Sequence, residues 1–234
     1  MRSVAITSGP TQEPLDEVRY FSNRSTGRLG VELAASFAGA GYRVCFFHGP
    51  GALKPQASEA VALQPFTTAA SLGRLLIDLF GRPGSPRLLV HAAAVADYAP
   101  EPVPGKLSSS EPELLLRLRP TPKLADLLRH CHPELPMILF KLESGIERAE
   151  LHRRARATLE RVGALGIVAN LAEQVTETSH RADFLRRDGT LHSLETRSEI
   201  AACLVREADA LFQPPPLGED GPGASDGPDG RRAE

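Results

Sequence analysis

The stretch VAITSGPT, residues 4–11, decides the fold class, because a short apolar run that ends at Gly9-Pro10 predicts a buried strand followed by a loop. Apolar residues then recur at the spacing of one helix face: Leu29, Leu33, Phe37 and Ala40. A second apolar run, VCFF, covers residues 44–47. Two strands joined by a helix form a βαβ unit, and such units build parallel sheets. This part of the chain therefore predicts an α/β fold.

The same alternation of strand and helix patterns continues along the chain. Further strands are expected at residues 61–66, 88–95, 114–118, 137–142 and 167–169, and further helices at residues 71–80, 122–130, 146–162 and 195–212. A turn at Asp188-Gly189 predicts a hairpin over residues 184–194. Together these elements predict a Rossmann-like open sheet, mostly parallel, with helices on both faces and a small C-terminal hairpin.

The last 22 residues differ from the rest of the 234-residue chain in composition. They hold five Pro, five Gly, five acids and two bases, so their net charge is −3, and the whole-chain value of −2 leaves +1 for the remainder. Such a composition does not support a packed core. We therefore predict one domain over residues 1–212 and a disordered, Pro/Gly-rich acidic tail over residues 213–234.

Charge and hydropathy exclude several classes of protein. A body near neutrality has no basic stripe for nucleic acid. The apolar runs fall far short of the roughly 18–20 residues that a membrane-spanning helix needs. The N-terminal sequence MRSVAITSG has no secretory pattern, and the three Cys form no C-x-x-C pair. We expect a cytoplasmic protein with neither nucleic-acid nor membrane partners.

The loop after the first strand is long. About 18 residues separate the strand and helix patterns, where a βα loop usually has 2–6. This loop offers the side chains of Asn23, Ser25 and Thr26 and the free N–H groups of a helix start, which suit an anion. An alternative with equal support from spacing is that Ser25 or Thr26 caps the helix. The G-x-G-x-x-G dinucleotide fingerprint is absent.

A second polar loop follows the run HAAAV, residues 91–95. Asp97, at the mouth of this strand, can hold Mg²⁺ or a ligand hydroxyl, although an Asp that caps a turn is commoner. Lys106 follows in a Pro/Gly-rich segment, where it is either solvated or bound to phosphate. The phosphate interpretation gains weight because only four of the 27 basic residues are Lys.

A third polar loop follows the strand that ends near Leu142. In FKLESG, residues 140–145, the Phe140 ring offers a surface on which a base can stack, although a core position is commoner. The consecutive side chains of His130-Cys131-His132 cannot converge on one metal ion, and we expect them at the surface. The chain contains no G-x-S-x-G elbow, P-loop or H-E-x-x-H motif.

Taken in order, these segments resemble the phosphopantothenate–cysteine ligase (phosphopantothenoylcysteine synthetase) family in its stand-alone form. The family's TSGGT, VRF-like run and N-x-S-S-G-x-x-G match residues 7–11, 18–21 and 23–30. Its A-A-V-[AS]-D, Lys motif, asparagine-proline segment, F-x-x-E-[TS] and V-A-N match residues 93–97, Lys106, and residues 121–124, 140–144 and 168–170. The likeness covers roughly residues 3–210.

The resemblance implies a nucleotide-dependent carbon–nitrogen ligase of coenzyme A biosynthesis. Such an enzyme joins 4'-phosphopantothenate to L-cysteine through an acyl-nucleotidylate, with CTP or ATP as co-substrate and Mg²⁺ as cofactor. The family is homodimeric and binds phosphopantothenate near the dimer interface. No covalent enzyme nucleophile is required, which agrees with the absence of a nucleophile motif.

The resemblance also implies a set of site residues. Asn23 and Lys106 are the expected catalytic residues, because Asn23 would bind the acyl intermediate and Lys106 the triphosphate. The expected nucleotide-binding residues are Ala93, Ala94, Val95, Asp97, Lys106, Thr121, Pro122, Lys123, Leu124 and Phe140. The expected substrate-binding residues are Asn23, Ser25, Thr26 and Gly27, and Asp97 is the candidate Mg²⁺ ligand.

Two departures from the family pattern keep other functions open. Pro10 replaces the second Gly of TSGGT and removes a backbone N–H. Two lysines of bacterial members fall at Thr158 and Val162, which slightly favours ATP over CTP; the nearby bases are Arg154, Arg156 and Arg161. A catalytically lapsed nucleotide-binding relative would share both departures. An NAD(P)-binding reductase would need a Tyr-x-x-x-Lys pair, whereas residues 20–24 end in Arg.

Overall fold

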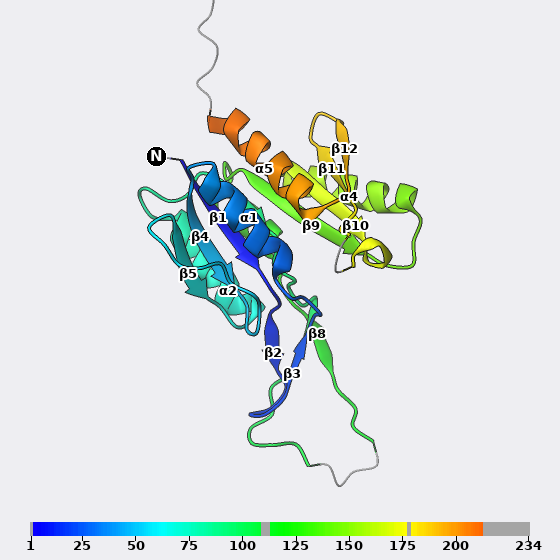
Figure 1. Cartoon of the computed structure of the whole chain (residues 1–234). Helices are drawn as coiled ribbons and strands as arrows, with labels where there is room; N and C mark the ends of the chain where they lie inside the picture. The colour runs from blue at the N-terminus through cyan, green and yellow to red at the C-terminus, as the bar shows by residue number, and fades with distance from the viewer. Residues whose placement is uncertain (1, 109–112, 177–178, 213–234) are drawn as a thin grey trace, which may run out of the picture.

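The computed structural model describes residues 2–108, 113–176 and 179–212, so the predicted tail at residues 213–234 lies outside the described part. Its main feature is an eight-stranded sheet with the order β12-β11-β10-β9-β6-β1-β4-β5 (Figure 1). The strands are β1 Ser3–Ser8, β4 Arg43–His48, β5 Val61–Pro65, β6 Leu89–His91, β9 Met137–Glu143, β10 Gly166–Leu171, β11 Ala182–Arg186 and β12 Leu191–Leu194. Only β11 and β12, the C-terminal hairpin, run antiparallel to their neighbours in this sheet.

Helices cover both faces of the sheet, as the sequence predicts. Helices α1 (Arg28–Gly39) and α5 (Arg197–Phe212) lie side by side on one face, and the other face carries α2 (Ala69–Phe80), α3 (Leu124–Cys131) and α4 (Arg148–Val162). Alternate residues of each strand therefore enter two separate cores. In β1, for example, Val4 and Ile6 pack toward α1 and α5, whereas Ala5 packs toward α2. The predicted α/β class and hairpin are confirmed.

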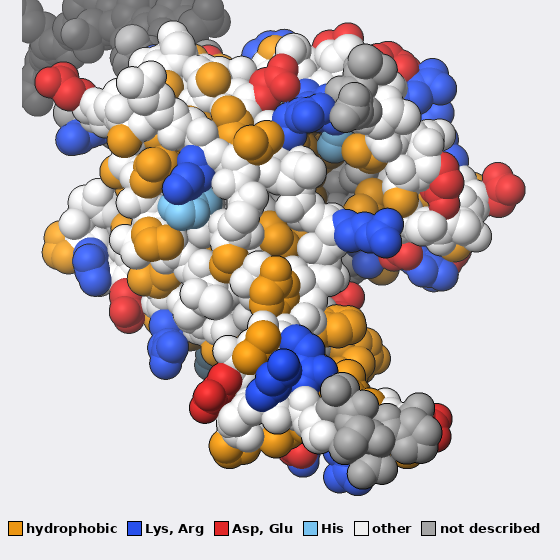
Figure 2. Space-filling model, turned by 60° about the horizontal axis from the view of Figure 1, so that its bottom comes forward, with side chains coloured by type: hydrophobic (Ala, Val, Ile, Leu, Met, Phe, Trp, Pro, Cys, Tyr) orange, Lys and Arg blue, Asp and Glu red, His pale blue; other side chains and the backbone are white. Residues whose placement is uncertain are grey.

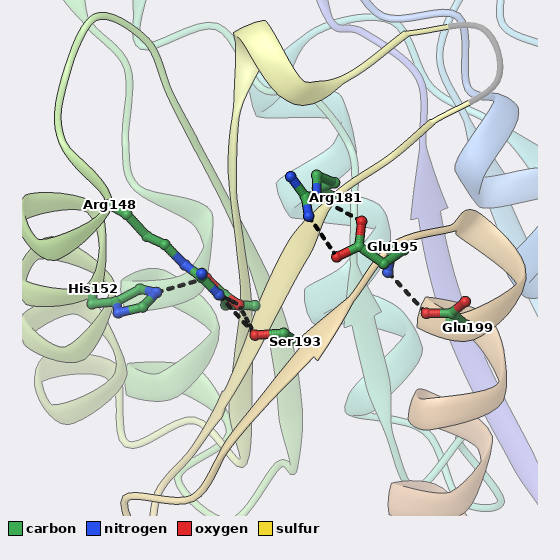
Figure 3. Close-up of polar contacts among 7 residues, drawn as sticks. Arg148, His152, Arg181, Ser193, Glu195 and Glu199 are labelled. Carbon is green, nitrogen blue, oxygen red and sulfur yellow. Dashed lines mark hydrogen bonds and ion pairs between the residues drawn. The ribbon is translucent and has the colours of Figure 1, made fainter.

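The hairpin is held against α4 by a buried carboxylate. Asp183 accepts hydrogen bonds from Arg148 Nε and His152 Nε2, both at 2.7 Å, and from Ser193 Oγ at 2.8 Å. Figure 3 shows Arg148 and His152 of α4 and Ser193 of the hairpin pointing toward one another. Burial alone would raise the pKa of Asp183, but the three hydrogen bonds hold it below its ordinary value. The carboxylate therefore stays charged and fixes the antiparallel edge of the sheet.

A second region, the arm, projects from the edge at which the parallel strands end, called here the carboxyl edge (Figure 1). It consists of residues 12–22, 98–108 and 113–120. Strands β2 (Gln12–Pro14) and β3 (Tyr20–Ser22) form one antiparallel pair, and β7 (Tyr98–Pro100) and β8 (Leu118–Pro120) form the other. The long loop after β1 and the Pro-rich segment after Asp97 thus build a common structure that the sequence did not predict.

A carboxylate also organises the tip of the arm. Asp16, whose side chain is buried, accepts N–H bonds from Val18 at 2.8 Å, Arg19 at 2.6 Å and Leu107 at 3.0 Å. The Arg19 guanidinium, 2.6 Å away, is the main reason that the pKa of Asp16 lies well below its ordinary value. One charged group therefore ties the β2–β3 turn to the segment after β7.

Several predicted boundaries are corrected. The strand expected at residues 114–118 is wrong, because β8 begins only at Leu118 and pairs with β7 on the arm. The run expected as a strand at residues 88–95 leaves the sheet after His91. Helix α3 starts at Leu124, so Pro122 precedes it. Among the described residues, no helix is both long and apolar enough to cross a membrane.

Candidate active site

The loops after β1 and β6 are joined by backbone hydrogen bonds at the carboxyl edge. Ala94 N–H donates to Gly9 O at 2.8 Å, and Thr11 N–H donates to Ala94 O at 3.2 Å. Pro10 forms a parallel bridge with Ala94. The N–H that Pro10 lacks is therefore not needed for this junction. In an open α/β sheet, ligands bind at this edge, where the order of the strands reverses. Here the reversal falls between β1 and β6.

Two threonines of the TSGPT segment extend the junction. Thr7 Oγ1 accepts from Ala93 N–H at 3.1 Å, and Thr11 Oγ1 accepts from Ala96 N–H at 3.0 Å. Thr7 Oγ1 also lies 2.8 Å from Nδ1 of His91, whose pKa burial lowers to about 4. The imidazole is therefore neutral at physiological pH. These contacts hold the A-A-V backbone in place beside the first loop.

Asn23 lies against the same backbone. Its Nδ2 donates to Val95 O at 3.0 Å, and the side chain remains exposed. The adjacent Ser22 hydroxyl donates to Thr11 O at 2.7 Å and positions the segment. This hydrogen bond therefore joins two segments that lie 72 residues apart in the sequence. The amide oxygen of Asn23 remains able to accept a further hydrogen bond.

The start of α1 uses glycine, and the alternative that Ser25 or Thr26 is the N-cap is wrong. Gly27 is the N-cap with a φ of 74°, so the N-cap residue itself supplies no side-chain cap. Ser8 Oγ donates to Gly27 O at 3.2 Å. A Cβ on Gly30 would lie 2.0 Å from Ser8 Oγ, so the first helical turn requires glycine there. Ser25 and Thr26 thus border the helix start, where Thr26 Oγ1 accepts a hydrogen bond from Arg28 N–H at 3.4 Å.

Asp97 and Lys123 form an exposed ion pair at the base of the arm. Lys123 Nζ lies 2.5 Å from Asp97 Oδ1, with side chains 59% and 70% exposed. Thr121 reinforces the contact, because its N–H donates to Asp97 O at 2.9 Å and its hydroxyl donates to Ala96 O at 2.5 Å. Lys123 also occupies the N-cap of α3, with Pro122 before it and Leu124 buried in the first turn.

The carboxylate of the Asp97–Lys123 pair is also the expected Mg²⁺ ligand. This ion is usually held by one or two carboxylates together with the phosphate oxygens of a substrate. Asp97 supplies one carboxylate, and the described residues contain no group of three His, Cys, Asp or Glu side chains that could hold a metal ion. An Mg²⁺ ion at Asp97 would therefore need further ligands from a bound substrate.

The end of β9 brings the FKLE segment to the same edge. Phe140 is partly buried and packs against the core under α1 and α5. Lys141 and Arg154 both contact Glu143, at 2.9 and 3.1 Å. Leu142 is 58% exposed, and Asn170, its register partner at the end of β10, is buried. Asn170 is a candidate site residue that the motifs did not single out. The available signal was a polar amide at the end of the apolar V-A-N run, residues 168–170.

The positions of the missing lysines have different environments. Val162 is 1% exposed and belongs to the core, so a lysine cannot be presented to a ligand from there without rearrangement. Thr158 donates its hydroxyl to Arg154 O at 3.1 Å. Of the nearby arginines, Arg161 pairs with Asp126, whereas Arg154 reaches Glu143 at the carboxyl edge.

Lys106 is separated from the other expected site residues. Its neighbours are fixed to the tip of the arm, since Gly105 O accepts from Glu17 N–H at 3.1 Å and Leu107 N–H donates to Asp16. Asp97 lies at the base of the arm. The structure therefore brings together Asn23, the Ala93–Val95 backbone, Asp97 and residues Thr121–Leu124. Phe140 lies two strands away from β1 in the sheet, and Lys106 remains at the far end of the arm.

An open, mostly parallel sheet whose polar loops meet at the carboxyl edge defines a Rossmann-like α/β protein with a candidate small-molecule site. The chain belongs to the family described as the DNA/pantothenate metabolism flavoprotein C-terminal domain, whose model matches residues 1–211. The family assignment that the motifs predicted is therefore confirmed.

Similar proteins agree with this family. The "Coenzyme A biosynthesis bifunctional protein CoaBC" of Mycolicibacterium smegmatis is 32% identical over 221 residues, 88% of this chain and 52% of that protein. The protein of the same name from Methanocaldococcus jannaschii is 33% identical over 167 residues, 71% of this chain and 40% of that protein. The chain thus spans about half the length of these relatives. The DNA/pantothenate metabolism flavoprotein from Streptococcus pneumoniae has a TM-score of 0.82 and 29% identity, over 91% of this chain and all of that one.

Proposed function

We propose that the chain is a phosphopantothenate–cysteine ligase of coenzyme A biosynthesis, with 4'-phosphopantothenate, L-cysteine and a nucleoside triphosphate as substrates. The family and the relatives named for coenzyme A biosynthesis support this proposal. The observation that carries it is the hydrogen bond from Asn23 to Val95 O, because it unites the two motifs to which the family resemblance assigns binding of the acyl substrate.

The proposed reaction has two steps. In the first, a carboxylate oxygen of phosphopantothenate forms a bond to the α-phosphorus, and the bond from the α-phosphorus to the bridging oxygen breaks to release pyrophosphate. In the second, the cysteine amine attacks the acyl carbon, the acyl–oxygen bond breaks, and the nucleoside monophosphate leaves as the amine loses a proton. Each step joins or separates anions, so cations and hydrogen-bond donors are the groups required of the protein.

The residues at the carboxyl edge suit these steps. Asn23, held by Val95 O, would bind the acyl-nucleotidylate as the catalytic amide. The Ala93–Val95 backbone would frame the acyl group, and Ser25–Gly27 would face the substrate phosphates from the start of α1. On the nucleotide side, Phe140 would support the base. Thr121–Leu124 would contact it through the backbone, and Asp97 would sit close to the nucleotide.

The nucleotide would be CTP or ATP and would bring Mg²⁺ as its own complex. The absence of the two helix lysines favours ATP, because Val162 is a core position and Arg154 is already engaged by Glu143. A cytoplasmic location fits substrates that are intermediates of coenzyme A synthesis. The retained junction at Ala94, which Thr11 supports in place of Pro10, favours an active enzyme over a lapsed relative.

The arm supports a homodimer. Nine of the 12 large hydrophobic side chains that are exposed in the described part lie on the arm: Val18, Tyr20, Phe21, Tyr98, Val103, Leu114, Leu115, Leu116 and Leu118. Figure 2 shows hydrophobic side chains on the projecting arm and over the face from which it extends. Apolar surface gathered in this way marks an interface. A second copy would cover it, and Lys106 would then reach the site of the partner subunit.

Pyrophosphate release tests the proposal. The full chain is incubated with Mg²⁺, phosphopantothenate and cysteine, with either CTP or ATP. We expect release that depends on phosphopantothenate, and an amide product only when cysteine is present. A folded protein that releases no pyrophosphate with either nucleotide would contradict the proposed function. Hydride transfer from NADPH in the same samples would instead support the reductase alternative.

A further inference from the structure

The loop after β4, residues 49–54, lies against the first motif. Leu53 N–H donates to Thr26 O at 2.9 Å, immediately before the start of α1. A Cβ added to Gly9 would lie 2.4 Å from Ala52 Cβ, so this loop and the turn after β1 are packed without spare room. The loop is therefore fixed at the same carboxyl edge as the proposed nucleotide site, although the family motifs do not include it.

This loop carries a cation, Lys54, shortly after His48 at the end of β4. His48 is the last residue of β4, in register with Ser8 at the end of β1. Burial, and to a smaller extent the charge of Lys54, lower the pKa of His48. Lys54 follows Leu53, whose N–H is bonded to Thr26 O, so the Lys54 backbone lies at the carboxyl edge. Lys54 itself is exposed and makes no ion pair with any of the described residues.

Other lysines at this edge already have carboxylate partners. Lys123 pairs with Asp97 at 2.5 Å, and Lys141 pairs with Glu143 at 2.9 Å. A nucleoside triphosphate carries several negative charges that need compensation when they leave water. Lys54 is a cation whose charge is available for that purpose without first breaking an ion pair with a described residue.

The order of the strands indicates how a bound nucleotide would lie along the carboxyl edge of the sheet. From β9, which carries Phe140, to β4 there are three strand spacings, about 14 Å in total. The junction of Asn23 with Val95 lies between them, at the ends of β1 and β6. A nucleotide with its base at Phe140 and its α-phosphate at this junction therefore directs its β- and γ-phosphates toward the end of β4.

We propose that Lys54 binds the β- and γ-phosphates of the nucleotide and holds the pyrophosphate that leaves in the first step. The proposal rests on the proposed ligase function. As the bond between the α-phosphorus and the bridging oxygen breaks, its electron pair stays on that oxygen, and the ammonium stabilises the added charge. Lys54 thereby assists activation of the carboxylate and takes no part in the attack by the cysteine amine.

Pyrophosphate binding to the full chain provides the test. Calorimetric titration with Mg²⁺-pyrophosphate measures the dissociation constant of the wild type and of three variants. A charge-assisted contact predicts at least about tenfold weaker binding for Lys54→Gln, and Lys54→Arg should retain most of the affinity. Arg82→Gln, an equal loss of charge just beyond α2 at the opposite edge of the sheet, serves as the control and should bind like the wild type.

Kinetics separate this proposal from the ligase proposal. Lys54→Gln should raise KM for the nucleotide, whereas KM for cysteine should stay unchanged. Equal pyrophosphate affinity for Lys54→Gln and the wild type, or no binding by the wild type, would overturn the role of Lys54. A wild type that binds pyrophosphate through Lys54 but forms no amide would support the Lys54 site and contradict the ligase function.

Discussion

The sheet and the arm are built on opposite principles. Apolar side chains of the sheet are buried under helices on both faces, and its loops present polar groups at one edge. The arm buries a carboxylate, Asp16, and exposes most of its large apolar side chains. The sheet is therefore covered on both faces by helices of its own chain, whereas the arm exposes apolar surface that the proposed homodimer would cover. This difference suggests that the proposed active site draws on both regions, with the arm acting between subunits.

The largest expected effect comes from the arm. Lys106→Gln should reduce pyrophosphate release at least about 100-fold, because in the proposed homodimer Lys106 supplies a cation to the triphosphate as charge develops on the leaving pyrophosphate. Stopped-flow or steady-state assays of pyrophosphate release measure the change. Arg117→Gln is the matched control, since it removes an exposed charge from the same arm and should keep near-normal activity. Near-normal release by Lys106→Gln would show that Lys106 takes no part in the reaction.

In the sheet, the expected effect of a substitution is a loss of folding stability. A Cβ on Gly166 would lie 2.4 Å from the Phe184 ring, so Gly166→Ala should destabilise the fold by about 1–3 kcal/mol. Gly39→Ala provides the control, because nothing lies within 4 Å of its added Cβ. Thermal and denaturant unfolding measure both variants. Equal stability of the two would show that the contact between β10 and β11 is looser than described.

Asn23 connects the two regions and should act on one step. Asn23→Ala removes the amide that Val95 O holds, so amide formation should fall about tenfold more than activation. The comparison requires pyrophosphate release and amide product to be measured in the same samples. An equal loss in both steps would refute a specific contact with the acyl-nucleotidylate.

The smallest expected effect is a local loosening of the arm in acid. The pKa of Asp16 is lowered in the folded state, so its contribution holds above the ordinary Asp value of about 3.9 and fades as pH falls below it. Hydrogen exchange at the Leu107 N–H should therefore accelerate a few-fold below about pH 4, relative to core amides. Asp16→Asn should show this acceleration already at neutral pH, and Asp78→Asn on α2 should not. Unchanged exchange in Asp16→Asn would show that other contacts hold the arm.

The sequence predicted the sheet far better than the arm, for a physical reason. Runs such as residues 4–6 and 137–139 are apolar because they are buried on both faces of the sheet, which is the signal that periodicity detects. The run at residues 114–118 is equally apolar but exposed, so its composition predicts a strand in the wrong place. Strands of three residues, such as β2, leave too little pattern to recognise.

The candidate site was likewise predictable only in part from the sequence. Strand ends locate the polar loops, so Asn23 and Asp97 were predictable as members of one edge. Which of them touch was not predictable, because the ion pair of Asp97 with Lys123 and the bond from Asn23 to Val95 O depend on how distant loops cross. The position of Lys106 at the end of an arm likewise follows from tertiary contacts that periodicity does not encode.

Mixed dimers test most directly whether the sheet and the arm of two subunits form one site. Asn23→Ala and Lys106→Gln chains carry separate affinity tags, are coexpressed, and the heterodimer is purified through both tags. If Lys106 acts on the partner subunit, the heterodimer holds one site with an intact Asn23 and an intact Lys106, and it should regain amide formation that both homodimers lack. A purified heterodimer as inactive as its parents would contradict the account.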